Sequence, residues 1–342
     1  MRLFLLPIST RRSLIYCERL SSSSPSSSSS TPAGKRSLLD RITTKASETW
    51  VAWEKDEKAP LAWKQKVTRY GNHALARIPY EEWGLKTIPA LTARRRKAIE
   101  DGSEEYHITF PGLYLPQDKI PTVLKQLASE RQAMHRRKMI WSVVAMPFSA
   151  PFMLIPVIPN LPFFYLVYRA WSHWKALNGS KTLEFLLAHN LPTPRPSSDL
   201  DEVYTAGLMY PTRAISRAAP RPTLTQAQDV ARVVQQQTKD GADDVMVLQR
   251  WNGKLIAEQA KLPDMEIEIE RAVEQVQRSL KAKERLAEEK LELEKATAAE
   301  GKTAKDVLPA EVLEKVALTE ETEQAIHEKA EKVANGDGKK EV

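Results

Sequence analysis

Two histidines, His135 and His173, have the clearest potential for chemistry, because they flank an uncharged stretch of the sequence on its two sides. Imidazole changes its charge near neutral pH, so histidines at these positions can take part in proton-linked work. The alternative is that both are ordinary polar residues at the edges of an apolar segment. The basic residues beside them are Arg136, Arg137, Lys138 and Arg169.

Other motifs in the sequence lack the spacing that catalysis or metal binding requires. Gly179–Thr182 lacks the upstream glycine and the Gly-Lys-Thr order of a phosphate-binding loop. Asn335–Gly338 has no closing glutamate for a calcium loop. The six histidines show no metal-ligand spacing, and a single cysteine, Cys17, excludes an internal disulfide or a thiolate metal site. The sequence therefore predicts no enzymatic activity, no metal site and no cofactor.

The segment between the histidines, Met139–Tyr168, runs for 30 residues without a charge. It is longer than the roughly 20 residues with which a helix crosses a bilayer. Prolines divide it, and each one inside a helix removes a backbone donor and clashes with the preceding turn. They are Pro147, Pro151, Pro156, Pro159 and Pro162. Broken backbone at membrane depth must be satisfied by protein or trapped water, so a partner chain or an oligomer is expected.

Three arrangements fit this segment. In a hairpin, two apolar arms meet at a turn, and both ends emerge on the matrix side, as the basic flanks favour. In a single span, Met139–Ile158 crosses the membrane and Leu161–Trp174 lies along the far interface. In the third arrangement, the segment is a buried core hairpin of a soluble domain. The turn of the membrane hairpin would contain Pro156, Pro159, Asn160 and Pro162.

Aromatic side chains gather near the ends of the uncharged segment. Tryptophan and tyrosine are enriched at membrane–water interfaces, so these residues are candidates for an interfacial belt. Core packing is the alternative for each of them. The candidates are Trp141, Tyr165, Tyr168, Trp171 and Trp174.

The distribution of charge distinguishes three parts of the chain. The whole sequence has a net charge of +7 and a mean hydropathy of -0.44, which excludes a polytopic membrane carrier. Residues 1–36 carry +5, residues 37–175 carry +8 and residues 176–342 carry -6. The first part is basic, serine-rich and poor in acids, which is typical of a mitochondrial transit peptide able to form an amphipathic helix. A plastid transit peptide and a disordered basic tail are the alternatives. We expect it to be removed, together with Cys17.

Hydrophobic periodicity predicts the elements that position these residues. Helices are expected at 38–53, at 63–74, from Pro121 into the uncharged segment, at 224–237, at 243–260 and at 265–296, the last with coiled-coil-like spacing. A short strand is expected at 106–110, an irregular connector at 77–89, and breaks at 190–196 and 219–222.

The predicted fold class is mainly α. We expect a membrane-anchored helical protein with a proline-broken apolar hairpin or single span, flanked by soluble helices and a C-terminal charged helix. The expected regions are a transit peptide (1–36), a basic Trp-rich soluble region (37–118), a membrane-associated hairpin region (119–190), a Pro-punctuated helical region (191–260), and an acidic coiled-coil-like helix with a disordered tail (261–342).

Several segments together resemble a known family. His135–Lys138, the proline-rich part Pro147–Phe163 and Tyr168–Ala176 resemble the fungal mitochondrial potassium/proton exchange-related family of inner-membrane proteins. Tyr70–Asn72 and Ile78–Lys86, with Trp63 and Lys64 before them, resemble the N-terminal signature of that family. The resemblance covers roughly residues 48–260 and leaves the transit peptide and the acidic tail outside.

The resemblance implies a part in potassium–proton exchange across the mitochondrial inner membrane and in control of matrix volume. Because the uncharged segment contains no Asp, Glu, Lys, Arg or His, a subunit or regulator is expected rather than a complete exchanger. The soluble parts would lie in the matrix. Expected partners are inner-membrane lipids and other exchange components or further copies of the chain, and direct nucleic-acid binding is not expected. The alternative function is a scaffold or assembly factor that tethers a matrix complex such as the ribosome.

Overall fold

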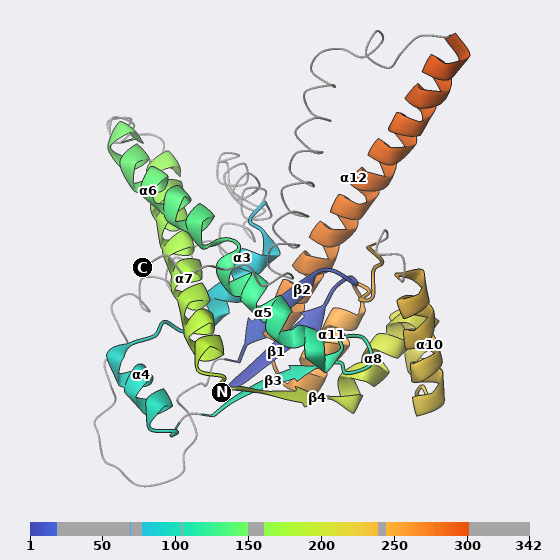
Figure 1. The fold of residues 1–342 in the computed structure, drawn as a ribbon, viewed down its shortest axis with the longest axis horizontal. Helices are drawn as coiled ribbons and strands as arrows, with labels where there is room; N and C mark the ends of the chain where they lie inside the picture. Colours follow the sequence, from blue (N-terminus) through green and yellow to red (C-terminus); the bar gives the residue numbers. More distant parts are fainter. Residues whose placement is uncertain (19–68, 70–76, 104, 150–160, 239–243, 301–342) are drawn as a thin grey trace, which may run out of the picture. The chain divides into compact units, whose positions relative to one another are not determined.

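The computed structural model describes residues 1–18, 69, 77–103, 105–149, 161–238 and 244–300. The helices expected at 38–53 and 63–74 lie outside these residues. The chain forms two compact units, Met1–Arg278 and Ser279–Val342. The first unit contains a small sheet surrounded by helices, so the prediction of a mainly helical protein is confirmed (Figure 1).

The sheet has four strands in the order β2-β1-β3-β4. β1 (Arg2–Pro7) pairs antiparallel with β2 (Ser13–Cys17) and parallel with β3 (Tyr106–Phe110), and β3 pairs parallel with β4 (Pro192–Pro196). The strand expected at 106–110 is confirmed. It stands beside β1, with Leu3 opposite Ile108.

The structure corrects the expectation of an amphipathic helix at the start of the chain; residues 19–36 of the expected presequence lie outside the described residues. Residues 2–7 and 13–17 form β1 and β2 rather than an amphipathic helix, and all residues of the two strands except Arg2 are buried. Leu3, Leu5, Ile15 and Cys17 belong to the main hydrophobic core. The apolar residues between the arginines of this segment belong to buried strands. Removal of this segment would leave β3 without one of its two neighbours in the sheet.

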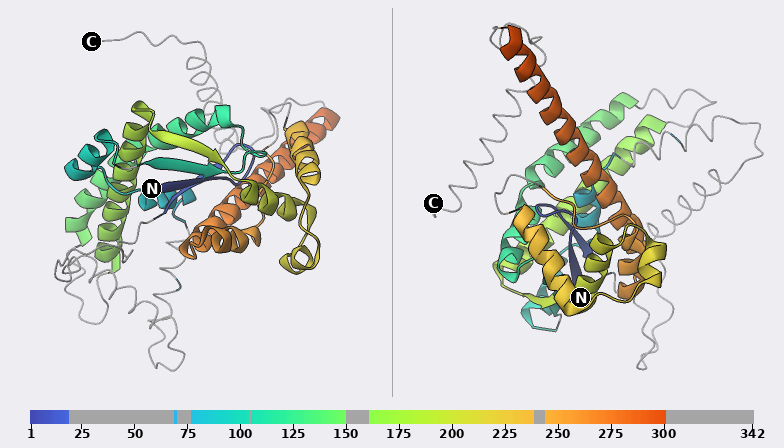
Figure 2. Two further views of the ribbon diagram at one scale, coloured as in Figure 1. Left: turned by 90° about the horizontal axis from the view of Figure 1, so that it is seen from below. Right: turned by 90° about the vertical axis from the view of Figure 1, so that its right-hand side faces the viewer.

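Helices pack on both sides of the sheet (Figure 2). They are α3 (Tyr80–Thr87), α4 (Ala93–Glu100), α5 (Ile120–Ser129), α6 (Gln132–Ser149), α7 (Leu161–Ala188), α8 (Ser198–Met209), α9 (Arg213–Ala218), α10 (Leu224–Gln237), α11 (Asn252–Ala260) and α12 (Asp264–Glu300), with a 3-10 turn at Gln117–Lys119. The main core joins residues of β1, β2 and β3 to Leu85 of α3, Leu124 of α5 and Leu183 of α7. At the other end of β1, the hydroxyl of Tyr204 on α8 donates to the carbonyl of Pro7 at 3.0 Å.

Two glycines allow α3 to approach both of its neighbours closely. A methyl group at Gly84 would overlap the carbonyl oxygen of Ile15 in β2. A methyl group at Gly179 of α7 would overlap the carbonyl oxygen of Leu85 in α3. In addition, the backbone N–H of Cys17 donates to the Thr87 hydroxyl at 2.8 Å, so α3 covers the outer edge of the sheet at β2. Helix α3 is therefore held at a fixed depth between β2 and α7.

The opposite edge of the sheet is formed by β4, where the sequence predicted a break. Prolines at 192, 194 and 196 lack N–H donors on one side of the strand, and the other side pairs with β3. The outer edge therefore offers no N–H donors to a further strand. The prolines were correctly identified as helix breakers, but this pattern is also that of a protected edge strand.

The remaining helix predictions are confirmed to different degrees. α10 has the expected bounds, 224–237, and α12 includes the expected helix at 265–296. The helix expected from Pro121 is divided into α5 and α6, and only the second half of the segment 243–260 is helical, as α11. The connector expected at 77–89 is wrong, because Tyr80–Thr87 is α3.

Helices α6 and α7 form an antiparallel hairpin, hereafter the hairpin (Figure 1). His135 on α6 contacts His173 on α7, so both ends of the uncharged segment lie together. This contact contradicts the single-span alternative, in which they would lie on opposite sides of a membrane. Residues 150–160, which include Pro156, Pro159 and Asn160, lie outside the described residues. Within the described residues, no helix has both the length and the apolar composition that crossing a membrane requires.

We predict that Gly179→Ala destabilises the protein by about 1–3 kcal/mol, because the added methyl group must push α7 away from α3. Urea unfolding followed by circular dichroism measures this change. Lys181→Ala on the exposed side of the same helix is the control and should change the free energy of unfolding by less than about 0.5 kcal/mol. Equal stability of the two variants would contradict the close packing of α3 on α7.

We also predict that the folded protein isolated from mitochondria retains residues 2–17, which mass spectrometry of its N-terminal peptide can verify. Because Leu5 is fully buried in β1, Leu5→Ala should lower the free energy of unfolding by about 2–5 kcal/mol. Leu286→Ala is the control, since Leu286 is 63% exposed. A mature chain that begins after residue 17 and unfolds cooperatively would overturn this prediction.

Candidate functional site

Six polar side chains meet in the interior of the first unit, where the hairpin packs against α3. They are Glu82 and Lys86 on α3, His135 on α6, and Arg169, Ser172 and His173 on α7. We refer to these six residues as the ion network. Five of them are buried, and the side chain of Arg169 is largely so. Charged groups are rarely buried unless they are paired, so each buried charge of this cluster is expected to have a partner of opposite charge or a hydrogen bond.

Glu82 is the centre of the ion network. Its carboxylate accepts hydrogen bonds from both terminal nitrogens of Arg169, at 3.0 and 3.3 Å, and from the Ser172 hydroxyl at 2.5 Å. The Lys86 ammonium donates to the Ser172 oxygen at 2.9 Å. These bonds join α3 to α7 through charged groups, which form stronger hydrogen bonds than neutral groups do.

The two histidines complete the ion network and connect α7 to α6. The Nδ1 atoms of His135 and His173 are 3.0 Å apart. The Nε2 atom of His173 is 2.9 Å from Arg169 Nη2. Because a guanidinium only donates, His173 Nε2 must accept this bond, and its proton then lies on Nδ1. That proton is donated to His135 Nδ1, which leaves the proton of His135 on Nε2.

These assignments leave the imidazoles no free lone pair. His173 Nε2 accepts from Arg169, and His135 Nδ1 accepts from His173. Within the described residues, His135 Nε2 has no hydrogen-bond partner. A further proton on either imidazole must therefore displace an existing hydrogen bond, either the one between α6 and α7 or the one between Arg169 and His173.

Burial is the main cause of the shifted pKa values. It lowers the pKa of both His135 and His173 to about 4, although the nearby Glu82 carboxylate opposes this shift. For Glu82, burial alone would raise the pKa, but the hydrogen bond from Ser172 and the charge of Arg169 outweigh it and the pKa is lowered. At neutral pH the network therefore contains an ionised glutamate and two neutral imidazoles.

Lys86 is the member of the ion network that titrates near neutral pH. Burial lowers its pKa to about 7, against the favourable charges of Glu82 and Glu268 and with the repulsion of Arg169 and Arg271. Its ammonium lies 3.3 Å from the centre of the Trp83 ring, and the guanidinium of Arg271 on α12 lies 4.3 Å from the same ring. Arg271 also pairs with Glu268 at 2.6 Å. Lys86 is thus surrounded by charges from α3, α7 and α12.

Glu82, His135 and His173 offer ligand atoms within 4.8 Å of one another, an arrangement that resembles a zinc site. The chemistry of the neighbouring groups is unfavourable for a metal ion. Arg169 and Lys86 already supply two cations for one carboxylate, and a divalent ion would add two more positive charges in a buried place. The imidazole lone pairs are also used by the hydrogen bonds described above. We therefore interpret the cluster as a proton-sensitive network rather than a metal site.

The structure brings together three of the residues that the sequence singled out. His135, Arg169 and His173 are members of the ion network, whereas they were predicted to flank a membrane segment separately. Arg136, Arg137 and Lys138 are exposed on α6, away from the network. Pro162 lies in the first turn of α7.

Four of the five candidate aromatic residues are exposed on the hairpin, and Tyr168 is half-buried. Core packing is thus excluded for the exposed four within this fold. They are Trp141, Tyr165, Trp171 and Trp174.

Sequence reasoning missed Glu82, Lys86 and Ser172. Pro79 and Pro89 suggested an irregular connector, although Pro79 is the residue before a short helix and proline is well tolerated there. The signal that was available is the order of charges, with Glu81 and Glu82 in the first turn and Lys86 in the last, as a helix dipole favours. Ser172 carries no signal, because a serine in a long helix is unremarkable until its neighbours are known.

Comparison with known proteins assigns the region that contains this site. The family described as mitochondrial K+-H+ exchange-related matches residues 2–187, which include every member of the ion network and both arms of the hairpin. The match begins with β1, so the first strands are part of the family region and not peripheral to it.

Two fungal proteins are similar over much of the chain. An uncharacterized protein of Schizosaccharomyces pombe is 29% identical over 220 residues, which are 63% of this chain and 89% of that protein. An uncharacterized protein of Saccharomyces cerevisiae is 29% identical over 168 residues, which are 41% of this chain and 52% of that protein. No solved structure matches the chain.

The histidine pKa values predict a pH dependence of stability. Unfolded histidine has a pKa of about 6.5, so between pH 6.5 and 4 the unfolded chain binds more protons than the folded one, and the free energy of unfolding falls as the pH falls. His135→Gln keeps a hydrogen-bond acceptor for His173 but does not titrate, so this dependence should become shallower.

Urea unfolding at a series of pH values measures the effect. His189→Gln is the control, because His189 is exposed and lies outside the ion network. An unchanged pH dependence in His135→Gln would show that the histidine pair is not buried in its neutral form.

Proposed function

The chain belongs to the mitochondrial K+-H+ exchange-related family, and from this membership we propose that it acts in potassium–proton exchange across the inner membrane as a subunit or regulator without enzymatic activity. The observation that carries the proposal is the ion network, which lies where the hairpin packs against α3. A group that couples ion exchange to protons must change its contacts when it gains or loses a proton. Lys86, whose pKa is about 7, donates to Ser172, and each imidazole would have to give up a hydrogen bond to accept a proton.

We place the hairpin in the membrane in this proposal, with the rest of the first unit in the matrix. Its surface carries large apolar side chains, among them Phe148, which is 78% exposed, and Phe164, which is 61% exposed. Large exposed apolar side chains gathered on two adjacent helices indicate a surface that contacts a partner or a membrane. Ser149 lies 14 residues beyond His135 on α6, so this part of the arm rises about 21 Å. That length exceeds one leaflet of a hydrocarbon core about 30 Å thick.

The ion network is then the connection between the hairpin and the matrix unit. Arg169 of the hairpin binds Glu82 of α3, and Ser172 accepts from Lys86. Beside Arg169, His135 and His173 join the two arms of the hairpin. Proton binding to the ion network changes the hydrogen bonds and ion pairs that hold the hairpin against α3. This change is the coupling step that we propose.

Lys86 gives the network sensitivity near neutral pH. The groups that face it are Glu82 from α3, Arg169 and Ser172 from α7, and Glu268 and Arg271 from α12. Loss of its proton leaves Glu82 paired with Arg169 alone. The exchange component would therefore respond to matrix pH in the range in which Lys86 changes its charge.

We predict that mitochondria lacking the protein swell more slowly in potassium acetate, that nigericin restores the swelling rate, and that the wild-type chain also restores it. The double variant His135→Gln/His173→Gln should fail to restore the rate, because it changes the hydrogen bonds that join the imidazoles to each other and to Arg169. His107→Gln/His189→Gln is the control with the same number of substitutions outside the ion network, and it should restore swelling.

Unchanged swelling in mitochondria that lack the protein would remove the claim of a part in potassium–proton exchange. If the rate falls but both double variants restore it, the ion network is not the coupling element. The scaffold alternative predicts a different result, in which swelling is normal while the chain co-purifies with a matrix complex such as the ribosome.

A further inference from the structure

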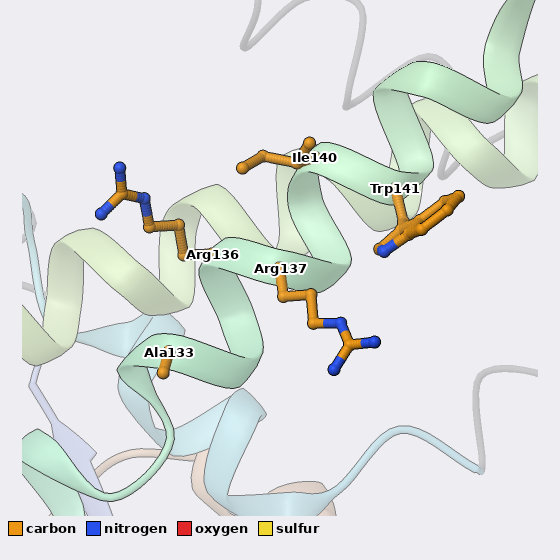
Figure 3. A pocket seen from close by; sticks show the side chains of 5 residues that line it. All are labelled: Ala133, Arg136, Arg137, Ile140 and Trp141. Carbon is orange, nitrogen blue, oxygen red and sulfur yellow. The ribbon is translucent and has the colours of Figure 1, made fainter.

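A shallow hollow of about 320 Å³ lies on the surface of α6, just beyond the ion network in the chain. Its lining residues follow one another at helical spacing, so they form a single stripe along the helix. They are Ala133, Arg136, Arg137, Ile140 and Trp141. Figure 3 shows the two arginines extending to opposite sides of α6, with Ile140 and Trp141 one turn further along. The small side chain of Ala133 leaves the space between them open.

The arginines of this hollow are cations without counter-ions in the described part of the chain. Arg136, Arg137 and Lys138 are exposed and form no ion pair among the described residues. Helix α6 contains no acidic residue. Of the nearby carboxylates, Glu81 pairs with Arg131 and Glu184 accepts from Gln132, so both already have partners. The hollow therefore has a local positive charge available for an anionic ligand.

Polarity changes in one direction along the stripe. The guanidinium groups come first, and then follow Ile140, which is 50% exposed, and Trp141, which is 62% exposed. Val143, Val144 and Phe148 continue the exposed apolar surface toward the hairpin tip. From Arg137 to Phe148 the helix rises about 16 Å. The same order of groups, phosphate, interface and hydrocarbon, is found from the surface of a bilayer to its interior.

We propose that this hollow binds the headgroup of an anionic phospholipid in a bilayer, with Arg136 and Arg137 on the phosphate and with Ile140 and Trp141 against the first part of the acyl chains. This inference rests on the proposed membrane position of the hairpin and adds a lipid class and a site to it. A free phosphate would satisfy the arginines but not the apolar half of the stripe. A second copy of the chain would bring its own uncompensated arginines to the same surface.

Vesicle binding by the purified full-length chain tests the proposal. Vesicles of phosphatidylcholine alone are compared with vesicles that also contain phosphatidylglycerol, and co-sedimentation gives the two affinities. The wild-type chain should bind the anionic vesicles more tightly. Arg136→Gln/Arg137→Gln should weaken that binding roughly 30-fold, as expected for the loss of two basic residues near an anionic surface.

A matched control distinguishes a site from general attraction. Arg94→Gln/Lys97→Gln removes the same charge from exposed positions on α4 and should weaken binding less than about threefold. Arg136→Lys/Arg137→Lys retains the charge and should restore most of the affinity. Binding to neutral vesicles should be the same for all variants, because it depends on the apolar surface of the hairpin.

The possible failures are distinct. Equal loss in the two glutamine variants would show general electrostatic attraction and overturn the lipid site. Equal binding of both vesicle types by the wild-type chain would also overturn it, while leaving the membrane position of the hairpin intact. Absence of binding to either vesicle type would overturn both the site and that membrane position. Binding of inorganic phosphate with the same loss in Arg136→Gln/Arg137→Gln, but no preference for anionic vesicles, would identify a free anion as the ligand instead.

Discussion

The burial of Glu82 is the constraint on which the arrangement of the first unit depends. Its carboxylate is only 1% exposed, and an uncompensated charge in such a place costs several kcal/mol. Arg169 and Ser172 on α7 supply the compensation, so α3 and α7 must lie close together and in register. Gly179 makes that approach possible, because a side chain there would overlap the carbonyl oxygen of Leu85, and Gly84 allows α3 to approach Ile15 of β2 in the same way. The Glu82–Arg169 pair and Gly179 thus both require close packing of α3 on α7.

The same constraint explains why an N-terminal strand matters to a site made of helices. α3 is positioned by β2, through the contact of Gly84 with Ile15 and the hydrogen bond from Cys17 to Thr87. β2 is held in turn by β1, whose side chains fill the core under α5 and α7. A change in the first strands therefore moves the helix that carries Glu82 and Lys86. The family match, which begins at residue 2, is consistent with this structural dependence.

Helical periodicity predicted much of the fold. Local composition led to a wrong interpretation where the secondary structure depends on contacts with distant parts of the chain. The bounds of α10 followed from its own apolar spacing and its capping residues, so a local pattern was sufficient. In β1 the decisive fact is pairing with β3, about 100 residues away, which a local pattern does not contain. Arg2 and Arg12 suggested a presequence, yet Arg2 pairs with Glu18 and Arg12 with Asp244 on the folded protein.

The candidate site shows the same division between local and distant information. His135 and His173 were recognisable because each borders the uncharged segment, and only the turn of the hairpin brings them together. Their neighbours in the chain then acquire different roles through helical geometry. His135 is buried against α7, whereas Arg136 and Arg137, one and two residues later, are exposed on the outer surface of α6. Adjacent positions of one helix therefore serve the buried ion network and the exposed basic surface, and the local sequence pattern does not distinguish these two roles.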